Sequence, residues 1–207
     1  MSKRDLTALK ALFSQQDQKN EQRGPNNYFN FWDMPEGSQC IIRFLPDLNA
    51  DNSMGFVVEK KMHRLHVNGK YRSVPCNKMY NSTADCPACA VSAAYYKQDD
   101  KVLGKKYWRK QSYVTQALIV ESAVPVNEGE ESPVGQVKLI SLGYSLWKII
   151  KEAFEGGELE DVPFDFQNGC DFIIKKDKQG EYASYVLSQF SRRDRALTPD
   201  EIAYVES

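Results

Sequence analysis

The chain has 207 residues, and 42% of them are hydrophobic. It contains five cysteines and has a formal net charge of −1. This length supplies one good hydrophobic core, so we expect one elaborated domain rather than two. The sequence has no apolar stretch near 18 residues and no apolar signal-peptide core at its start, which argues against a membrane span and against export. An odd number of cysteines fits a reducing, cytosol-like compartment.

The first 25 residues differ from the rest of the chain. Three leucines and one phenylalanine between residues 6 and 13 predict a short helix with an apolar edge, and residues 15–24 are polar without an apolar period. We therefore predict an N-terminal arm and linker over residues 1–25. The arm either docks on a neighbouring molecule or folds back on its own domain.

The remaining chain is rich in β-strand patterns. Runs of Val, Ile, Tyr and Phe bounded by turn residues predict strands over residues 39–45, 56–61, 112–121, 136–142, 170–176 and 181–187, with a hairpin over 62–75. Cys40 and Cys170 lie in such runs, so we expect both in the core.

Two helices are predicted between the strands. Residues 145–154 form an amphipathic pattern that Ser145 can cap and Gly156-Gly157 can end, and residues 88–97 form a shorter helix. These elements indicate a mainly β fold with a few helices, of the α+β class. Short strands of this kind suggest an oligonucleotide/oligosaccharide-binding (OB) type β-barrel over residues 26–198, a fold that presents a groove for single strands.

Four soft-metal ligands occur in the pattern His63-x12-Cys76-x9-Cys86-x2-Cys89. A Cys-x2-Cys turn presents two thiolates to one ion, and a third Cys with a His completes the tetrahedral set that structural zinc prefers. The pattern predicts one structural Zn²⁺, because it leaves no position for a reactive water. The alternatives are a disulfide between the knuckle cysteines or ordinary buried thiols.

The choice of His63 over His66 follows from hairpin geometry. Asn68-Gly69 favours a two-residue type I′ turn, which pairs His66 with Tyr71 and His63 with Val74. Because side chains alternate between faces, His63 then lies on the face of Cys76, roughly 7–8 Å away on the diagonal, and His66 lies on the opposite face.

The small net charge hides a strong segregation of charge. Residues 53–120 carry 12 Lys and Arg against 4 Asp and Glu, whereas residues 121–170 carry 3 against 10. A basic block of this size suggests a surface that faces a polyanion, although a solvated charge pattern with no partner is the alternative.

Aromatic residues are interleaved with cations in and near the basic block. They are Tyr71-Arg72, Tyr95-Tyr96-Lys97 and Lys105-Lys106-Tyr107-Trp108-Arg109-Lys110, with Tyr113 following. Rings can stack on exposed bases, at roughly 1–3 kcal/mol per base, while Lys and Arg follow the phosphates. The combination favours binding of single-stranded nucleic acid, and the alternative for each ring is a place in the core.

At this point the sequence resembles a known family, the single-stranded DNA-binding, helix-destabilising proteins of T4-type bacteriophages. The residues that carry the resemblance, besides the metal ligands, are Ile41-Ile42-Arg43-Phe44-Leu45-Pro46, Asn68-Gly69-Lys70, Arg109-Lys110-x-Ser112-Tyr113, Gly143 with Trp147-Lys148, and Cys170-Asp171-Phe172-Ile173-Ile174-Lys175 followed by Tyr182, Tyr185 and Phe190. Their order and spacing, from about residue 40 to 190, make the match specific.

The resemblance implies an OB barrel with an inserted zinc-binding subdomain at about residues 56–110, and DNA in a basic, aromatic cleft between the two. Arg109, Lys110, Tyr113, Tyr182 and Tyr185 match cleft positions, and Tyr71 matches an aromatic position. The remaining candidates for DNA contact, from the same stretches of the chain, are Arg72, Tyr95, Tyr96, Lys105, Lys106, Tyr107 and Trp108.

The resemblance also implies a function without catalysis. The family binds single-stranded DNA cooperatively and with little sequence preference during phage replication, recombination and repair, in the cytoplasm of the infected bacterium. Its basic N-terminal arm mediates head-to-tail self-association, and Lys3, Arg4 and Thr7 fit that arm. We expect the family's acidic tail, which recruits replication and recombination proteins, to be missing after residues 199–207.

Two alternatives come from other functional classes. A zinc-containing RNA-binding regulator would use the same stacking chemistry, because a ring does not distinguish RNA from DNA. A zinc-dependent enzyme would need an open metal position or a carboxylate cluster, and Asp85 is the only acidic residue between the first and the last ligand.

Overall fold

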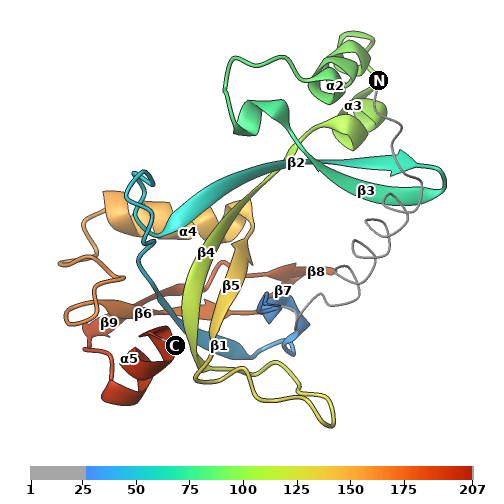
Figure 1. Cartoon of the computed structure of the whole chain (residues 1–207). Helices are drawn as coiled ribbons and strands as arrows, with labels where there is room; N and C mark the ends of the chain where they lie inside the picture. Colours follow the sequence, from blue (N-terminus) through green and yellow to red (C-terminus); the bar gives the residue numbers. More distant parts are fainter. Residues whose placement is uncertain (1–26, 207) are drawn as a thin grey trace, which may run out of the picture.

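The computed structural model describes residues 27–206 (Figure 1). The predicted N-terminal arm, with Lys3, Arg4 and Thr7, lies outside the described residues. Within residues 27–206, no helix is both long enough and apolar enough to cross a membrane.

The described chain forms a mainly β structure with four α-helices, which confirms the expected fold class. The strands are β1 (Gln39–Phe44), β2 (Val57–Val67), β3 (Lys70–Pro75), β4 (Lys110–Glu121), β5 (Val137–Leu142), β6 (Cys170–Lys175), β7 (Asp177–Gln179), β8 (Tyr182–Ser184) and β9 (Gln189–Asp194). The helices are α2 (Pro87–Lys97), α3 (Lys101–Tyr107), α4 (Tyr144–Glu155) and α5 (Pro199–Glu206), with short 3-10 turns η1 (Phe31–Asp33) and η2 (Asn77–Met79).

Strand β4 is the centre of the main sheet. Its second half pairs with β1, its first half pairs with β2, and β5 runs along its other edge. The sheet then continues from β1 to β6 and β9. Helix α4 contacts β4, β5 and β9, so it packs across this sheet. We call β1, β4, β5, β6, β9, the first part of β2 and α4 the barrel.

The barrel encloses a large apolar core. Phe44, Phe172 and Phe190 contact one another with ring centroids 4.9–6.0 Å apart, and Leu146 and Ile150 of α4 are buried against the same cluster. The expected core positions of Cys40 and Cys170 are confirmed, since both thiols are buried there.

A lobe projects from the barrel along the two longest strands. The first part of β2 pairs with β4, and its second part extends away from the barrel and forms a hairpin with β3 (Figure 1). The chain then forms η2, α2 and α3 before it re-enters the barrel as β4. We call residues 62–109 the metal lobe. Asn68 and Gly69 both have positive φ, at 49° and 77°, as the predicted type I′ turn requires.

The structure corrects several predicted elements. Helix α3 was not predicted, because residues 101–107 were interpreted only as a cluster of cations and rings. Strand β9 was also missed, since it carries a single buried apolar side chain, Phe190. The strand predicted over residues 181–187 is reduced to β8, and the N-cap of α4 is Gly143 rather than Ser145.

The C-terminal segment is a docked helix rather than a tail. Thr198 and Glu201 form a reciprocal capping box at the start of α5, with N···O distances of 3.3 Å and 2.8 Å. Ile202 then packs against Leu45 and Leu118 on the outer side of the sheet. This pattern is visible in the sequence Thr198-Pro199-Asp200-Glu201, but eight residues were enough to form a helix only because the barrel offers an apolar surface.

Candidate nucleic-acid interface and metal centre

The four predicted metal ligands come together in the metal lobe. His63 lies on β2, Cys76 follows β3, Cys86 is the N-cap of α2, and Cys89 is in the first turn of that helix. All four side chains are buried, and their ligand atoms lie within 4.8 Å of one another. The hairpin register is the predicted one, with His63 opposite Val74 and His66 opposite Tyr71.

The separations within this cluster suit a tetrahedral ion. The Sγ atoms of Cys86 and Cys89 lie 3.3 Å and 3.6 Å from His63 Nε2, and Cys76 Sγ lies 3.6 Å from Cys89 Sγ. With Zn–S near 2.3 Å and Zn–N near 2.0 Å, the edges of a tetrahedral site measure about 3.5–3.8 Å. All five cysteines are free thiols, so the structure does not adopt the disulfide alternative.

The surroundings of His63 suit the role of a metal ligand. Its Nδ1 lies 2.9 Å from the backbone carbonyl oxygen of Tyr107, at the end of α3. The ring donates its proton to that carbonyl, and the lone pair of Nε2 is then directed at the three sulfurs. The same contact connects the hairpin to α3.

Burial and hydrogen bonding act in opposite directions on the cluster thiols. Burial raises the pKa of Cys76. Burial also opposes ionisation of Cys86, but backbone N–H groups of Cys89 and Asn77 lower the pKa of that thiol to about 6. A cation bound in the cluster would favour the thiolate form of the sulfurs, and acid would weaken its binding because each ligand must first lose its proton.

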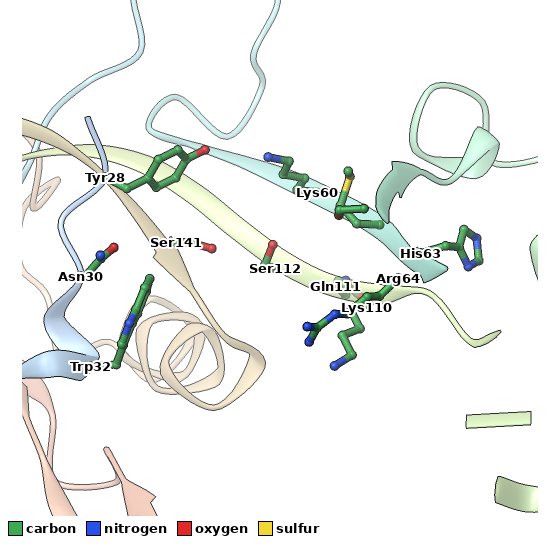
Figure 2. A pocket seen from close by; sticks show the side chains of 12 residues that line it. Tyr28, Asn30, Trp32, Lys60, His63, Arg64, Lys110, Gln111, Ser112 and Ser141 are labelled. Atoms are coloured by element: carbon green, nitrogen blue, oxygen red, sulfur yellow. The ribbon is translucent and has the colours of Figure 1, made fainter. Parts of the chain in front are cut away.

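A groove of about 610 Å³ lies between the barrel and the metal lobe. Its barrel side carries Tyr28, Trp32 and Ser141, and its lobe side carries His63 and Arg64 (Figure 2). The full lining is Tyr28, Asn30, Trp32, Lys60, Met62, His63, Arg64, Ser73, Lys110, Gln111, Ser112 and Ser141. Three of these residues are cations and none is acidic, so the groove has the charge of a phosphate-binding surface.

Figure 2 shows how the charged and aromatic groups are arranged in this groove. The rings of Tyr28 and Trp32 lie on one side, while the side chains of Arg64 and Lys110 extend together into the open space on the other. Trp32 is 44% exposed and is held in place because Lys176 Nζ donates to its backbone carbonyl at 2.6 Å. The groove thus combines exposed ring surface with cations, the two kinds of group that bind bases and phosphates of single strands in other proteins.

Sequence reasoning missed four cationic or aromatic residues that line the groove. Lys60 and Arg64 lie on β2, a stretch that was interpreted only for its metal ligand and its hairpin. Tyr28 and Trp32 lie in the chain before β1. The available signal was the density of rings in the short run Tyr28-Phe29-Asn30-Phe31-Trp32, of which the structure buries Phe29 and Phe31 and leaves Trp32 exposed.

Of the predicted DNA contacts, Lys110 lines the groove directly, and Tyr71 and Arg72 precede the lining residue Ser73 on β3 without lining the groove themselves. Tyr71 is 59% exposed, and the Arg64 guanidinium lies 4.6 Å from the centroid of its ring. Arg72 is exposed next to it. These three positions remain predictions for DNA contact.

The predicted contacts on α2 and α3 do not line this groove. The ring of Tyr95 stacks on that of Tyr107 at 5.7 Å, and Tyr96 meets the edge of Trp108 at 6.4 Å. Both pairs hold the two helices together. Lys105 and Lys106 are exposed on the last turn of α3, where the helix dipole favours cations. Contact of these residues with DNA stays a prediction.

The remaining predicted tyrosines occupy three different environments. Tyr113 is buried, with its ring stacked on Trp147 at 4.3 Å, so it is packed in the core here, and its contact with a base stays a prediction. Tyr185 is half-buried, and its ring meets the ring of Phe31, the residue before Trp32, edge-on with centroids 5.4 Å apart. Tyr182, on β8, is 79% exposed.

A second groove lies next to the first and has the opposite charge. It shares Tyr28 and Asn30 with the first, and its lining includes Asp33, Glu130 and Glu131 against a single cation, Lys138. Two of these acids belong to the segment between β4 and β5, within the acidic block of the sequence. This charge marks one end of the cationic surface.

Comparison with known protein families matches residues 36–203 to the family described as gp32 DNA binding protein like. A comparison with curated proteins finds no match. The family match covers most of the chain and includes the barrel, the metal lobe and most of α5. The chain therefore belongs to the gp32-like family of DNA-binding proteins, and the resemblance to the T4-type single-stranded DNA-binding proteins is confirmed.

Proposed function

We propose that this protein coats single-stranded DNA with little sequence preference, in the groove between the barrel and the metal lobe. The observation that carries the proposal is the lining of that groove. Lys60, Arg64 and Lys110 supply cations for phosphates, Trp32 and Tyr28 supply rings for bases, and the lining has no acidic side chain. Stacking and phosphate contact are both tolerant of sequence.

The proposed mechanism is mass action. A ligand that binds single strands better than duplex stabilises the open state of DNA, and the melting equilibrium shifts in proportion to its concentration. No bond is made or broken in this mechanism, so we propose a protein without enzymatic activity. The ligand set of three cysteines and one histidine supports this proposal, because four protein ligands complete a tetrahedral ion.

We assign the cysteine–histidine cluster to one structural Zn²⁺. His63 through Nε2 and the three thiolates would hold the ion, and the ion would supply only a fixed tetrahedral connection between β2, the end of β3 and α2. Since β2 and β4 carry cations of the groove, the ion would also hold the lobe side of the DNA-binding surface in place.

The biological setting follows from the family and is part of the proposal. We propose that the protein acts in phage DNA replication, recombination and repair, in the cytoplasm of the infected bacterium. Lys3, Arg4 and Thr7 are the proposed self-association residues, which would contact a neighbouring copy along the strand. Phage replication and recombination proteins are proposed partners.

Titration of the zinc-loaded protein with poly-dT, with a duplex of equal length and with poly-U tests this function. We expect tight, salt-sensitive quenching of intrinsic fluorescence by poly-dT and weak binding of the duplex. Equal affinity for poly-U would favour the RNA-binding alternative. Equal affinity for duplex and single strand would contradict the proposed mechanism.

A further inference from the structure

Arg109 and Lys110 are neighbours in the sequence but face different parts of the molecule. Lys110 is exposed and lines the cationic groove. Arg109 is half-buried, and its Nη1 lies 3.5 Å from Cys89 Sγ in the metal cluster. Among the residues the structure describes, Arg109 is the one cation that donates a hydrogen bond to a sulfur of this cluster.

The contact matters because of the charge of the loaded cluster. Three thiolates and a neutral imidazole around a divalent ion carry a net charge of −1. His63 belongs both to this cluster and to the lining of the groove, so the negative charge would lie beside the proposed path of the phosphates. A guanidinium at Cys89 cancels that charge where it would repel DNA.

The second face of the Arg109 side chain is also occupied. Its guanidinium carbon lies 4.6 Å from the centroid of the Trp108 ring, a cation–π contact. The ring of Trp108 contacts the ring of Tyr96 on α2. The Tyr96 ring in turn packs on Gly104 of α3, where a Cβ atom added to the glycine would lie 2.9 Å from the ring. Arg109 thus connects the metal cluster to the contact between the two helices.

We propose that Arg109 is a positioning residue of the metal centre, which neutralises the metal–thiolate cluster and holds α2 and α3 against it, and that it does not contact phosphate. The proposal rests on the zinc assignment in the proposed function. It separates two adjacent cations that the family resemblance places together in the cleft. Lys110 acts on DNA, and Arg109 acts on the ion.

Two full-length variants, Arg109→Gln and Lys110→Gln, separate these roles. The first measurement is the rate at which zinc passes from the loaded protein to a chromophoric chelator. The second is the slope of log Kobs against log salt concentration for an oligo-dT. We expect Arg109→Gln to lose zinc at least about tenfold faster than the native protein, because loss of an outer-shell partner typically weakens metal binding by about 10-fold or more. Its salt slope should be that of the native protein. We expect Lys110→Gln to lose zinc at the native rate and to lower the magnitude of the salt slope by about 0.7.

Native zinc transfer by Arg109→Gln would overturn the inference, and so would a slope change equal to that of Lys110→Gln. Arg109→Lys provides a second test should the glutamine variant fail to fold, because it keeps the charge without the planar stack. Its zinc transfer should fall between those of the native protein and Arg109→Gln, and a native rate would again overturn the inference. The zinc measurement needs no DNA, so it is independent of the proposed DNA binding. If the native protein bound no zinc at all, the metal assignment itself would be refuted.

Discussion

The barrel and the metal lobe are stabilised in different ways. The barrel buries a continuous set of aromatic and aliphatic side chains from β1, β4, β5, β6, β9 and α4. The buried hydrophobic cluster of the lobe consists of Cys76, Cys86 and Cys89, with only Ala88 packed against it. We therefore expect the barrel to fold on apolar burial, and the proposed ion would take the place of a core in the lobe.

This difference has a direct consequence for DNA binding. The groove takes residues from both parts, and strands β2 and β4 run from one part into the other. The barrel side of the groove includes Trp32 and Tyr28, and the side that the proposed ion would hold in place includes Arg64. Loss of the ion should thus remove one side of the groove while the other side remains folded.

The largest effect should come from removal of the metal. Structural zinc contributes about 10–16 kcal/mol in small zinc-finger peptides at neutral pH. After chelation, or in Cys86→Ser, we expect fast hydrogen exchange across residues 62–109 and unchanged protection in β1 and β6. Exchange measured by mass spectrometry checks this. Cys170→Ala, which removes a buried thiol from the barrel, is the matched control and should keep its zinc.

A uniform change in exchange over the whole chain would contradict the separation of the two parts. An unchanged lobe after verified loss of zinc would contradict the role of the ion in its folding.

The reverse experiment removes an apolar group from the barrel. Phe172 is fully buried and contacts Phe44 and Phe190, so Phe172→Ala should lower the free energy of unfolding by about 3–5 kcal/mol. Zinc content should be native in the fraction that stays folded. Denaturant unfolding and metal analysis measure the two quantities, and loss of zinc from a folded variant would mean that the lobe depends on the barrel core.

A change in the groove should affect binding without affecting either fold. Trp32→Ala should weaken oligo-dT binding by about 1–3 kcal/mol, the range for loss of one base–ring contact, with little change in the salt slope. Tyr144→Ala is the matched control, because Tyr144 is 65% exposed on α4 and does not line the groove. Equal losses in the two variants would place the bases elsewhere.

The smallest effect concerns α5 and depends on pH. Burial tends to raise the pKa of Glu201, but hydrogen bonds from Arg195 and Thr198 hold it below its ordinary value of 4.5. A carboxylate with a lowered pKa stabilises the fold above that value and loses its contribution as pH falls through the folded pKa. Glu201→Gln should therefore cost about 1–2 kcal/mol at neutral pH and less in acid.

Denaturant unfolding at neutral pH and at pH well below 4.5 measures this difference. Glu152→Gln removes an exposed partner of Lys148 on α4 and is the control, with almost no expected effect. A cost for Glu201→Gln that is independent of pH would show that its ion pair with Arg195 does not stabilise α5.

The elements that could be predicted from sequence share a strong local signal. The metal ligands follow a spacing rule, Asn68-Gly69 specifies its own turn, and β1, β4 and β6 are runs of apolar residues. The register of the hairpin then selected His63 over His66 correctly. These predictions needed no knowledge of distant contacts.

The features that could not be predicted from the sequence depend on tertiary contacts. Tyr113 has the sequence context of a stacking residue, but Trp147 of α4 covers its ring. Trp32 lacks any nearby cation in the sequence, and only the fold brings it opposite Arg64 and Lys110. Strand β9 carries Ser191-Arg192-Arg193 and has almost no apolar pattern, so its place in the sheet comes from pairing with β6.

The central claim is that single-stranded DNA lies in the groove between the barrel and the metal lobe. The most direct test replaces its three cations together, in Lys60→Gln/Arg64→Gln/Lys110→Gln, and measures the salt dependence of oligo-dT binding. The control removes three exposed cations that do not line the groove, Lys148, Lys151 and Lys178. We expect a salt slope smaller in magnitude by about 2 in the first variant and a native slope in the control. A native slope and affinity in the first variant would contradict it.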